Sequence, residues 1–253
     1  MPTKITESTG RLSISFSGGR TSALMTKLLL ERYPEKEIQI TFANTGLEHH
    51  DTLRFVDDCD KQLFGGRVVW LEAVVNQEHG VGVRHKIVSY ETASRNGEPY
   101  RAGVSKYGLW NQANPGCTAR LKTDVMESYL KTVGFVRGKD LNYETAIGIR
   151  ADEIDRMSAN AARHRFVYPM IGWGITKQDV LNVCSKWSFD LKIKEHYGNC
   201  VGCWKKTFRK LATIELENPG TLEWYRELED EFKLHKTTKA STDPQTGFRR
   251  MYR

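Results

Sequence analysis

"SFSGGRTSALMTKLLLERYP", residues Ser15–Pro34, decides the fold of this chain. The residues that lead into it, "RLSISF" (11–16), alternate polar and apolar side chains and predict a strand. Beyond Ser22, apolar residues recur at helical spacing. Two glycines between such elements let the backbone approach a ligand closely, and the start of a helix offers free N–H groups and partial positive charge to an anion. The stretch predicts a phosphate-binding turn, although an ordinary strand-to-helix connection has the same pattern.

Composition narrows the class of protein. The 253 residues suffice for one large domain, with or without an appendage, and 39% hydrophobic with 27% charged residues is typical of soluble globular proteins. No apolar run reaches the length of a membrane span, and "MPTKITESTG" (1–10) lacks the apolar core of a signal peptide, so we expect a cytoplasmic protein.

The formal charge of +7 favours a polyanionic partner such as nucleic acid, a nucleotide or an acidic protein, although charge spread over a surface can serve solubility alone. Basic residues cluster at two places: Lys205, Lys206, Arg209 and Lys210, and then Lys236, Lys239, Arg249, Arg250 and Arg253.

Strand and helix patterns alternate along the first part of the chain. "EIQITFANTG" (37–46) predicts a strand, 49–63 a helix, and "GRVVWLEAVV" (66–75) a strand buried inside a sheet. This order predicts a parallel sheet with helices on both faces. Residues 76–115 carry no sustained period and are basic, which is typical of a substrate loop or of a solvated insertion.

Regular patterns return after residue 115. We expect a helix over 118–133, a strand over 142–149, a helix over 176–187 capped by Thr176, and helical structure over 205–234 with a break at 218–220. We divide the chain into a nucleotide-binding domain, 1–190, and a basic helical C-terminal region, 191–253.

Five motifs stand in an order that resembles a known family. "SFSGGRTS" (15–22) lacks the ending of a Walker A loop and resembles the loop of PP-loop ATP pyrophosphatases, which split ATP between the α and β phosphates. "FANTGLEHHDTLRFVDDC" (42–59), "NPGCTARLK" (114–122), "IGIRADEIDR" (147–156) and "YPMIGWGITKQDV" (168–180) resemble stretches of the phosphoadenosine phosphosulfate reductase family within that superfamily. The resemblance implies the adenine nucleotide alpha hydrolase-like α/β fold, a parallel sheet flanked by helices, with a helical C-terminal extension here.

The resemblance also implies functional residues. Arg20 and Arg150 would be catalytic, because they can offset phosphate charge. Arg20 and Thr21 stand where many such loops have Lys and Asp, which makes ATP binding a firmer expectation than ATP cleavage. Asp152 and Glu153 would hold Mg²⁺, orient basic residues, or pair with a helix dipole. The residues implied to bind ATP are Ser15, Ser17, Gly18, Gly19, Arg20, Thr21, Ser22, Asn44, Thr45, Gly46, Gly148 and Arg150.

The cysteines suggest a metal centre. Five cysteines in a cytosolic chain argue against a disulfide framework, and the Cys200-x-x-Cys203 pair is flanked by glycines. The resemblance implies that Cys117 approaches this pair over the nucleotide site, so that three thiolates hold a [4Fe-4S] cluster, or Zn²⁺ with His196 as a fourth ligand. Cys59 and Cys184 lie within amphipathic patterns and are expected to be buried.

The number of ligands favours sulfur transfer. Cluster-containing reductases of the family show a paired Cys-Cys where this chain has Cys117 alone, and no cysteine follows Cys203 to act as the nucleophile of thioredoxin-dependent members. Related sulfurtransferases hold their cluster by three cysteines, which leaves one iron free to take up sulfide, and Cys117 would then be part of the catalytic centre. His49 and His50 could contact a ligand or lie at a solvated helix start, and Trp110 and Trp204 could stack on bases or fill the core.

We therefore predict ATP-dependent sulfur transfer to nucleic acid (tRNA or DNA) or to a nucleotide, similar to that of tRNA thiolases and DNA phosphorothioation enzymes. Two alternatives stay open: a reductase of adenylyl or phosphoadenylyl sulfate, and a zinc-containing nucleotide- or nucleic-acid-binding protein without catalysis. A sulfur-donor protein and a homodimer are possible partners that the sequence does not decide, and no membrane partner is expected.

Overall fold

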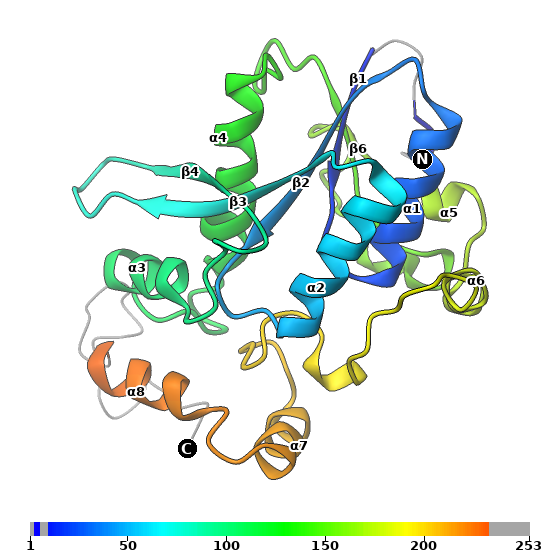
Figure 1. The fold of residues 1–253 in the computed structure, drawn as a ribbon. Helices are drawn as coiled ribbons and strands as arrows, with labels where there is room; N and C mark the ends of the chain where they lie inside the picture. The colour runs from blue at the N-terminus through cyan, green and yellow to red at the C-terminus, as the bar shows by residue number, and fades with distance from the viewer. Residues whose placement is uncertain (1–2, 6–9, 233–253) are drawn as a thin grey trace.

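A single sheet organises the chain, and all but one of its strands run parallel (Figure 1). The computed structural model describes residues 3–5 and 10–232. In spatial order the described strands are β4, β3, β2, β1, β5 and β6, and only β4 is antiparallel to its neighbour. Their bounds are β1 (Arg11–Ser15), β2 (Glu37–Asn44), β3 (Val68–Val75), β4 (Val83–Val88), β5 (Glu144–Ala146) and β6 (Phe166–Val167). The predicted parallel sheet is confirmed.

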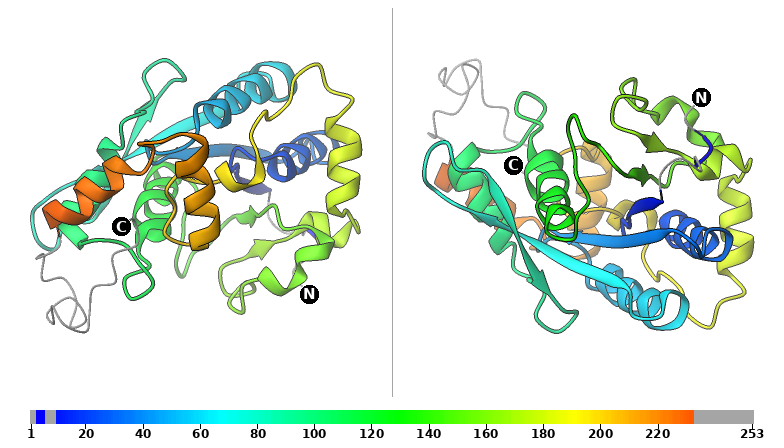
Figure 2. Two further views of the ribbon diagram at one scale, coloured as in Figure 1. Left: turned by 90° about the horizontal axis from the view of Figure 1, so that it is seen from below. Right: turned by 90° about the horizontal axis from the view of Figure 1, so that it is seen from above.

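Helices cover both faces of this sheet. The helices α1 (Arg20–Arg32), α2 (His50–Cys59) and α6 (Lys177–Cys184) pack on one face, and α3 (Glu98–Tyr107) and α4 (Asp124–Thr132) on the other. The end-on views of Figure 2 show α2 and α4 on opposite sides of the strands. Thr176 caps α6 through a capping box, as predicted. Among the described residues, no helix combines the length and the apolar character needed to cross a bilayer.

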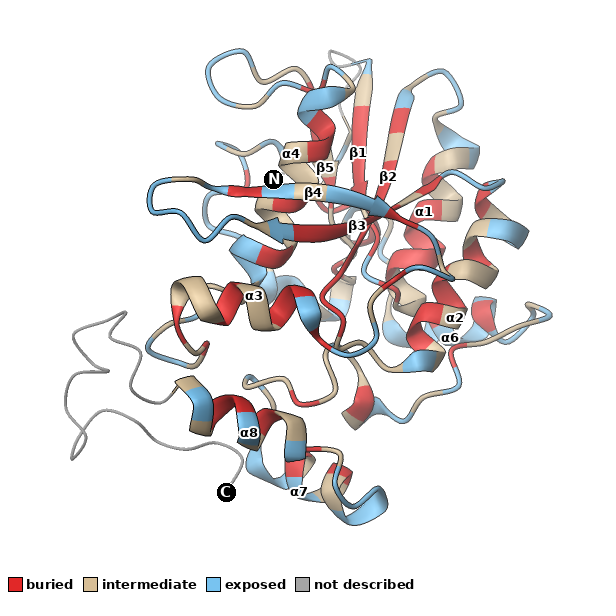
Figure 3. Ribbon diagram, turned by 60° about the vertical axis from the view of Figure 1, so that its left-hand side comes forward, coloured by how far each residue is buried: buried red, intermediate tan, exposed pale blue. Residues whose placement is uncertain are grey.

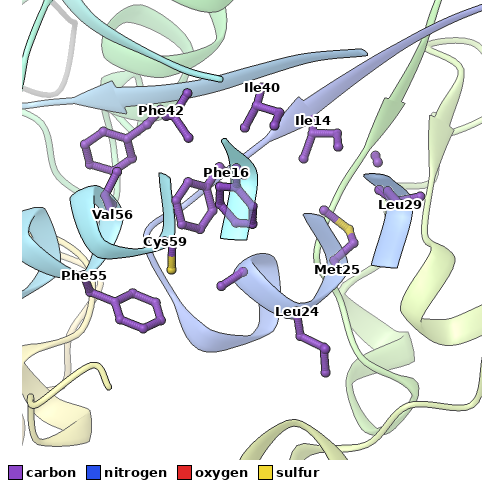
Figure 4. Close-up of a cluster of buried hydrophobic side chains, with 14 of the residues drawn as sticks. Ile14, Phe16, Leu24, Met25, Leu29, Ile40, Phe42, Phe55, Val56 and Cys59 are labelled. Atoms are coloured by element: carbon purple, nitrogen blue, oxygen red, sulfur yellow. The ribbon is translucent and has the colours of Figure 1, made fainter. Parts of the chain in front are cut away.

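The core follows the two-residue period of the strands. Trp70 and Leu71 are consecutive in β3 and belong to different hydrophobic clusters, one on each face of the sheet. Figure 4 shows one of these clusters, in which Phe16 and Phe42 face residues from α1 and α2. Cys59 and Cys184 are fully buried in it, which confirms the structural role expected for both.

Residues 76–115 are more regular than the sequence predicts. The segment contains β4 and α3, so the expectation of a long loop without secondary structure is wrong in this respect. Figure 3 shows that β4 is largely exposed, as befits an edge strand. The exposed charges of Arg84 and Lys86 on β4 protect that edge from pairing with another chain. The short strand β6 and the single-turn helix α5 (Pro169–Gly172) were also not predicted.

The C-terminal helices lie beyond the edge where the parallel strands end (Figures 1 and 2). Helices α7 (Phe208–Glu217) and α8 (Glu223–Phe232) flank the predicted break and, with Tyr197, form a small apolar cluster of their own. The boundary proposed at residue 190 stays a prediction. The basic tail from Lys236 to Arg253 lies outside the described residues.

We expect Ile14→Ala in β1 to lower the free energy of unfolding by about 2–5 kcal/mol, because it opens a cavity at a position with 0% exposure. Urea denaturation followed by circular dichroism measures the change. The matched control is Ile87→Ala in β4, where the side chain is 59% exposed, and it should cost well under half as much. Equal losses in the two variants would contradict this assignment of the core.

Candidate functional site

The glycine loop after β1 is held in shape by its own side chains. Gly18 has a φ of +75°, and a Cβ there would lie 2.9 Å from Thr52 and 3.0 Å from Val56, so that only glycine fits. The Ser22 hydroxyl accepts a hydrogen bond from the Ser17 N–H at 3.3 Å and donates one to the carbonyl of Gly19 at 2.9 Å. The loop therefore presents preformed backbone groups at the start of α1.

This loop forms the floor of a cavity of about 460 Å³, a size typical of small-molecule sites. The cavity gathers loop residues 17–22 with Gly148, Arg150 and Glu153, which come from the end of β5 and the turn that follows. A Cβ at Gly148 would lie 3.2 Å from the Cα of Ser22, so glycine is what lets these two backbones meet. The structure thus brings together the residues predicted to hold the phosphates, and it does so at the carboxyl edge of the sheet.

Arg20 forms hydrogen bonds with a segment that is distant in the sequence. Its Nε and Nη2 donate hydrogen bonds to the two carboxylate oxygens of Asp190, each at 2.7 Å, and Nη2 also reaches the carbonyl of Leu191. The Arg20 guanidinium holds the pKa of Asp190 below its usual range, chiefly through this hydrogen bond. The donors of Arg20 therefore fasten the 190–191 segment to the phosphate loop, and its catalytic role stays a prediction.

Arg150 faces the loop, and acidic residues orient it. Its Nη1 lies 3.3 Å from the hydroxyl of Thr21 and 3.2 Å from Glu153, and its Nε lies 3.0 Å from Asp152. Hydrogen bonding to Arg150 is the main reason why the pKa of Asp152 is lowered. Of the alternatives that the sequence left open for Asp152 and Glu153, the contacts favour orientation of a basic residue, and Mg²⁺ binding stays a prediction.

Four residues predicted to bind ATP are outside the cavity lining. The Ser15 hydroxyl points at Met126, at 3.6 Å, and the Asn44 amide donates to Glu72 at 2.7 Å and to the carbonyl of Ser94 at 2.9 Å. The hydroxyl of Thr45 donates to Glu48 at 2.9 Å, and the Gly46 N–H donates to Asn44 at 3.1 Å. These contacts shape the turn after β2 rather than presenting polar groups to a nucleotide.

The Cys200–Cys203 loop packs against this same turn. The N–H of Val201 donates to the carbonyl of Leu47 at 2.9 Å, and the Cys200 sulfur lies 3.3 Å from the Thr45 hydroxyl. Trp204 follows Cys203, and its indole N–H donates to the sulfur of Cys117 at 3.3 Å. The three predicted ligands, far apart in sequence, thus belong to one neighbourhood. Trp204 is part of it, whereas Trp110 is 4% exposed and fills the core.

Lys122 and Glu48 connect the cysteines to the cavity, because both residues also line it. The Lys122 ammonium lies 3.7 Å from Glu48, whose side chain is 3% exposed. Burial alone would lower the pKa of Lys122, but the charge of Glu48, together with that of the three cysteines where they are ionised, outweighs burial and raises the pKa. Burial, reinforced by Glu48, raises the pKa of Cys200 to about 12, so this sulfur stays protonated unless a metal displaces the proton.

Comparison with known proteins settles the family. A model of the phosphoadenosine phosphosulfate reductase domain matches residues 11–166. The chain belongs to the phosphoadenosine phosphosulfate reductase domain family. A relative is the uncharacterized nin region protein ORF290 of Escherichia phage lambda, which is 32% identical over 219 residues, or 85% of this chain and 73% of that protein.

Among solved structures, the U34-tRNA thiolase NcsA from Methanococcus maripaludis, with its [4Fe-4S] cluster, matches over 94% of this chain and 79% of that one. The identity is 14% and the TM-score 0.35, so this likeness carries no argument about function.

The identity of the metal at the cysteine neighbourhood, cluster or zinc, stays a prediction. Tetrahedral zinc with bonds of about 2.3 Å holds its thiolates roughly 3.8 Å apart. Among the described residues, the one trio of His, Cys, Asp or Glu side chains that gathers within 4.8 Å is His49, His50 and Asp51. His196 lies 2.9 Å from Glu217. Among the described residues, a compact zinc site of Cys117, Cys200, Cys203 and His196 is therefore not preformed.

Sequence reasoning missed several residues of this site. Lys122 is the last residue of the motif "NPGCTARLK", so the sequence could have indicated that it belongs to the site. Glu48 lies within the quoted motif of residues 42–59 and carried the same kind of signal, whereas Asp190 carried none, because its role arises from a contact with Arg20, 170 positions away. His49 caps α2 by accepting from the N–H of Asp51 at 3.2 Å, which agrees with the interpretation of the histidine pair as a helix start.

We expect Asp190→Asn to lower the free energy of unfolding at pH 7 by less than about 1 kcal/mol, because the pair with Arg20 is partly exposed. The pKa of Asp190 is lowered in the folded protein, so the pair stabilises it above the ordinary carboxyl pKa near ~4. That contribution is lost as the pH falls through the lowered value. Urea denaturation at neutral and acid pH should show a difference that vanishes in acid, and exposed Asp140→Asn should show none at either pH.

Proposed function

We propose that this chain catalyses ATP-dependent sulfur transfer to a nucleic acid or a nucleotide. The observation that carries the proposal is the shared wall formed by Glu48 and Lys122. Both residues line the cavity above the phosphate loop, and both interact with the cysteine neighbourhood. A nucleotide in the cavity and sulfur ligands behind it would therefore be adjacent.

In the first step, an oxygen of the acceptor attacks the α-phosphorus of ATP. A bond forms between that oxygen and phosphorus, the bond from the α-phosphorus to the bridging oxygen of pyrophosphate breaks, and pyrophosphate leaves with the electron pair. Backbone N–H groups of residues 18–22 and the forked donors of Arg150, all in the wall of the cavity, would bind the charge that develops on the phosphates. Thr21 holds Arg150 toward the loop.

In the second step, hydrosulfide replaces AMP on the acceptor. A carbon–sulfur bond forms, the bond from carbon to the adenylated oxygen breaks, AMP leaves with that oxygen, and the sulfur loses its proton to solvent. No electrons are gained or lost. The ammonium of Lys122 offsets the negative charge of the incoming sulfur. Cys117, Cys200 and Cys203 would hold a [4Fe-4S] cluster, which supplies, when bound, an iron free of cysteine for sulfide.

A reductase acting on adenylyl or phosphoadenylyl sulfate is the second candidate, and the family match favours it because the family takes its description from that activity. Such a reductase would act without nucleic acid. No cysteine follows Cys203 in this sequence, so the nucleophile of the thioredoxin-dependent members has no counterpart here.

We expect the anaerobically purified protein to contain about four iron atoms and four sulfides per chain. Cys117→Ala and Cys200→Ala should each lose most of both, because each removes one of three ligands. Cys184→Ala, at a cysteine buried away from this site, should keep them. Iron and acid-labile sulfide assays measure the outcome. Stoichiometric zinc in a colourless protein, or full iron in both ligand variants, would contradict the cluster.

We expect pyrophosphate release from ATP to depend on an added acceptor, with unmodified tRNA and single-stranded DNA as the first two tested. Arg150→Ala should slow release about a hundredfold, since it removes donors aimed at the phosphates. Arg163→Ala removes an exposed arginine and should leave the rate unchanged. Reduction of adenylyl sulfate to sulfite without nucleic acid, and no release of pyrophosphate, would favour the reductase.

A further inference from the structure

A second, smaller cavity of about 190 Å³ adjoins the nucleotide cavity. Glu195, Gly198 and Asn199 contribute to the walls of both, so the two cavities are neighbours. The remaining wall comes from the loop after the cysteine pair and from the start of α7. It includes Cys203, so this pocket also lies beside the cysteine pair.

Three lysines, Lys205, Lys206 and Lys210, line this pocket. Lys210 lies 3.3 Å from Glu195, an exposed residue that lies also within 4.0 Å of Lys177. Lys206 donates to the carbonyls of Gly198 and Cys200, at 2.7 and 2.8 Å. Within residues 10–232, no carboxylate forms an ion pair with Lys205 or Lys206, so the pocket carries an excess of positive charge.

The start of α7 adds to this charge. Thr207 lines the pocket and caps the helix by accepting from the N–H of Lys210. A ten-residue helix directs its partial positive charge and its free N–H groups toward a ligand at this end. The lysines and the helix end together make a site for a phosphate group.

Aromatic side chains accompany these cations. Phe208 follows Thr207 directly, and its side chain is 53% exposed, which is unusual for so large an apolar residue. The Lys205 ammonium lies over the ring of Trp204, 5.2 Å from its centre. Cations interleaved with accessible rings are the arrangement by which proteins bind unstacked nucleotides.

We propose that this basic pocket, together with the exposed Phe208 that follows Thr207 of its wall, binds single-stranded nucleic acid: a backbone phosphate lies among Lys205, Lys206 and Lys210, and a neighbouring base stacks on Phe208. This deepens the proposed function and rests on it, because it names the acceptor as a single-stranded stretch of nucleic acid. The strand would then pass beside Cys203 on its way to the nucleotide cavity. A free phosphate could also bind among the lysines, but it has no base to stack on Phe208.

The test is fluorescence anisotropy with a short labelled single-stranded oligonucleotide, in RNA and DNA form, over a range of salt concentrations. Lys205→Ala/Lys210→Ala should lower the affinity about tenfold and reduce the slope of log K against log salt by about 1.4, or about 0.7 for each lost phosphate contact. Phe208→Ala should weaken binding about tenfold with an unchanged slope, because it removes stacking alone.

Lys206 is left intact in these variants because it holds the cysteine loop. The matched control is Lys131→Ala/Lys139→Ala, which removes two exposed lysines at the opposite end of the sheet. It should bind like the wild type. Failure of the wild-type protein to bind either oligonucleotide, or equal losses in the pocket and control variants, would overturn the proposal.

Two further results distinguish a nucleic-acid site from a site for free phosphate, and this inference from the proposed function. If inorganic pyrophosphate displaces the oligonucleotide and Phe208→Ala has no effect, the pocket binds free phosphates and the nucleic-acid assignment is overturned. Iron content and acceptor-independent ATP binding report on the proposed function separately. If the protein contains no iron but still binds the oligonucleotide through this pocket, the sulfur-transfer proposal fails and this inference stands. If the lysine variant transfers sulfur and binds nucleic acid as tightly as the wild type, this inference fails and the sulfur-transfer proposal stands.

Discussion

The contact between Glu48 and Lys122 is the interaction on which the rest of the site depends. Glu48 is almost completely buried, and it also accepts hydrogen bonds from the turn after β2. Loss of either partner would leave the other charge uncompensated in the wall between the cavity and the cysteines. The pair therefore links the wall of the cavity to the Cys200 loop, and its lysine places a cation beside the three cysteines.

The sheet explains why these parts meet. Parallel strands end at one edge, and the turns after β1, β2 and β5 supply the phosphate loop, the Glu48 turn and the Arg150 turn. The C-terminal helices then close the same edge from below, bringing the cysteine pair with them (Figure 1). Chemistry on this fold is thus assembled from loops, while the strands and the two apolar clusters fix their spacing.

The sequence predicted the elements that have a strong period or a clear cap. Helices α1 and α6, strands β1 to β3 and the break between α7 and α8 were found, because amphipathic spacing and turn residues act locally. Strand β4 was missed because polar residues stand at three consecutive positions, 84–86, so its sequence does not alternate. Strand β5 was found within the strand predicted over 142–149, whereas β6, with two residues, is too short to show a period.

Prediction of the site likewise succeeded where the signal is local in the sequence and failed where a role depends on contacts made only in the folded chain. Gly18 and Gly148 could be predicted, since a close approach of the backbone requires glycine and the residue type is visible in the sequence. The engagement of Arg20 by Asp190 could not, because the two residues are 170 positions apart and only the packed fold brings them together. Asn44 illustrates the converse: its place at the end of β2 suggested a ligand, but the buried carboxylate of Glu72 takes its amide.

The crowding around Gly18 has an evolutionary consequence. Thr52 and Val56 of α2 fill the space where a side chain at position 18 would lie. A glycine there permits branched residues at 52 and 56, and those residues in turn forbid anything but glycine. The positive φ of Gly18 would exclude most side chains even if α2 carried smaller residues, so we expect the loop of related chains to keep this glycine while positions 52 and 56 vary toward equal or smaller size.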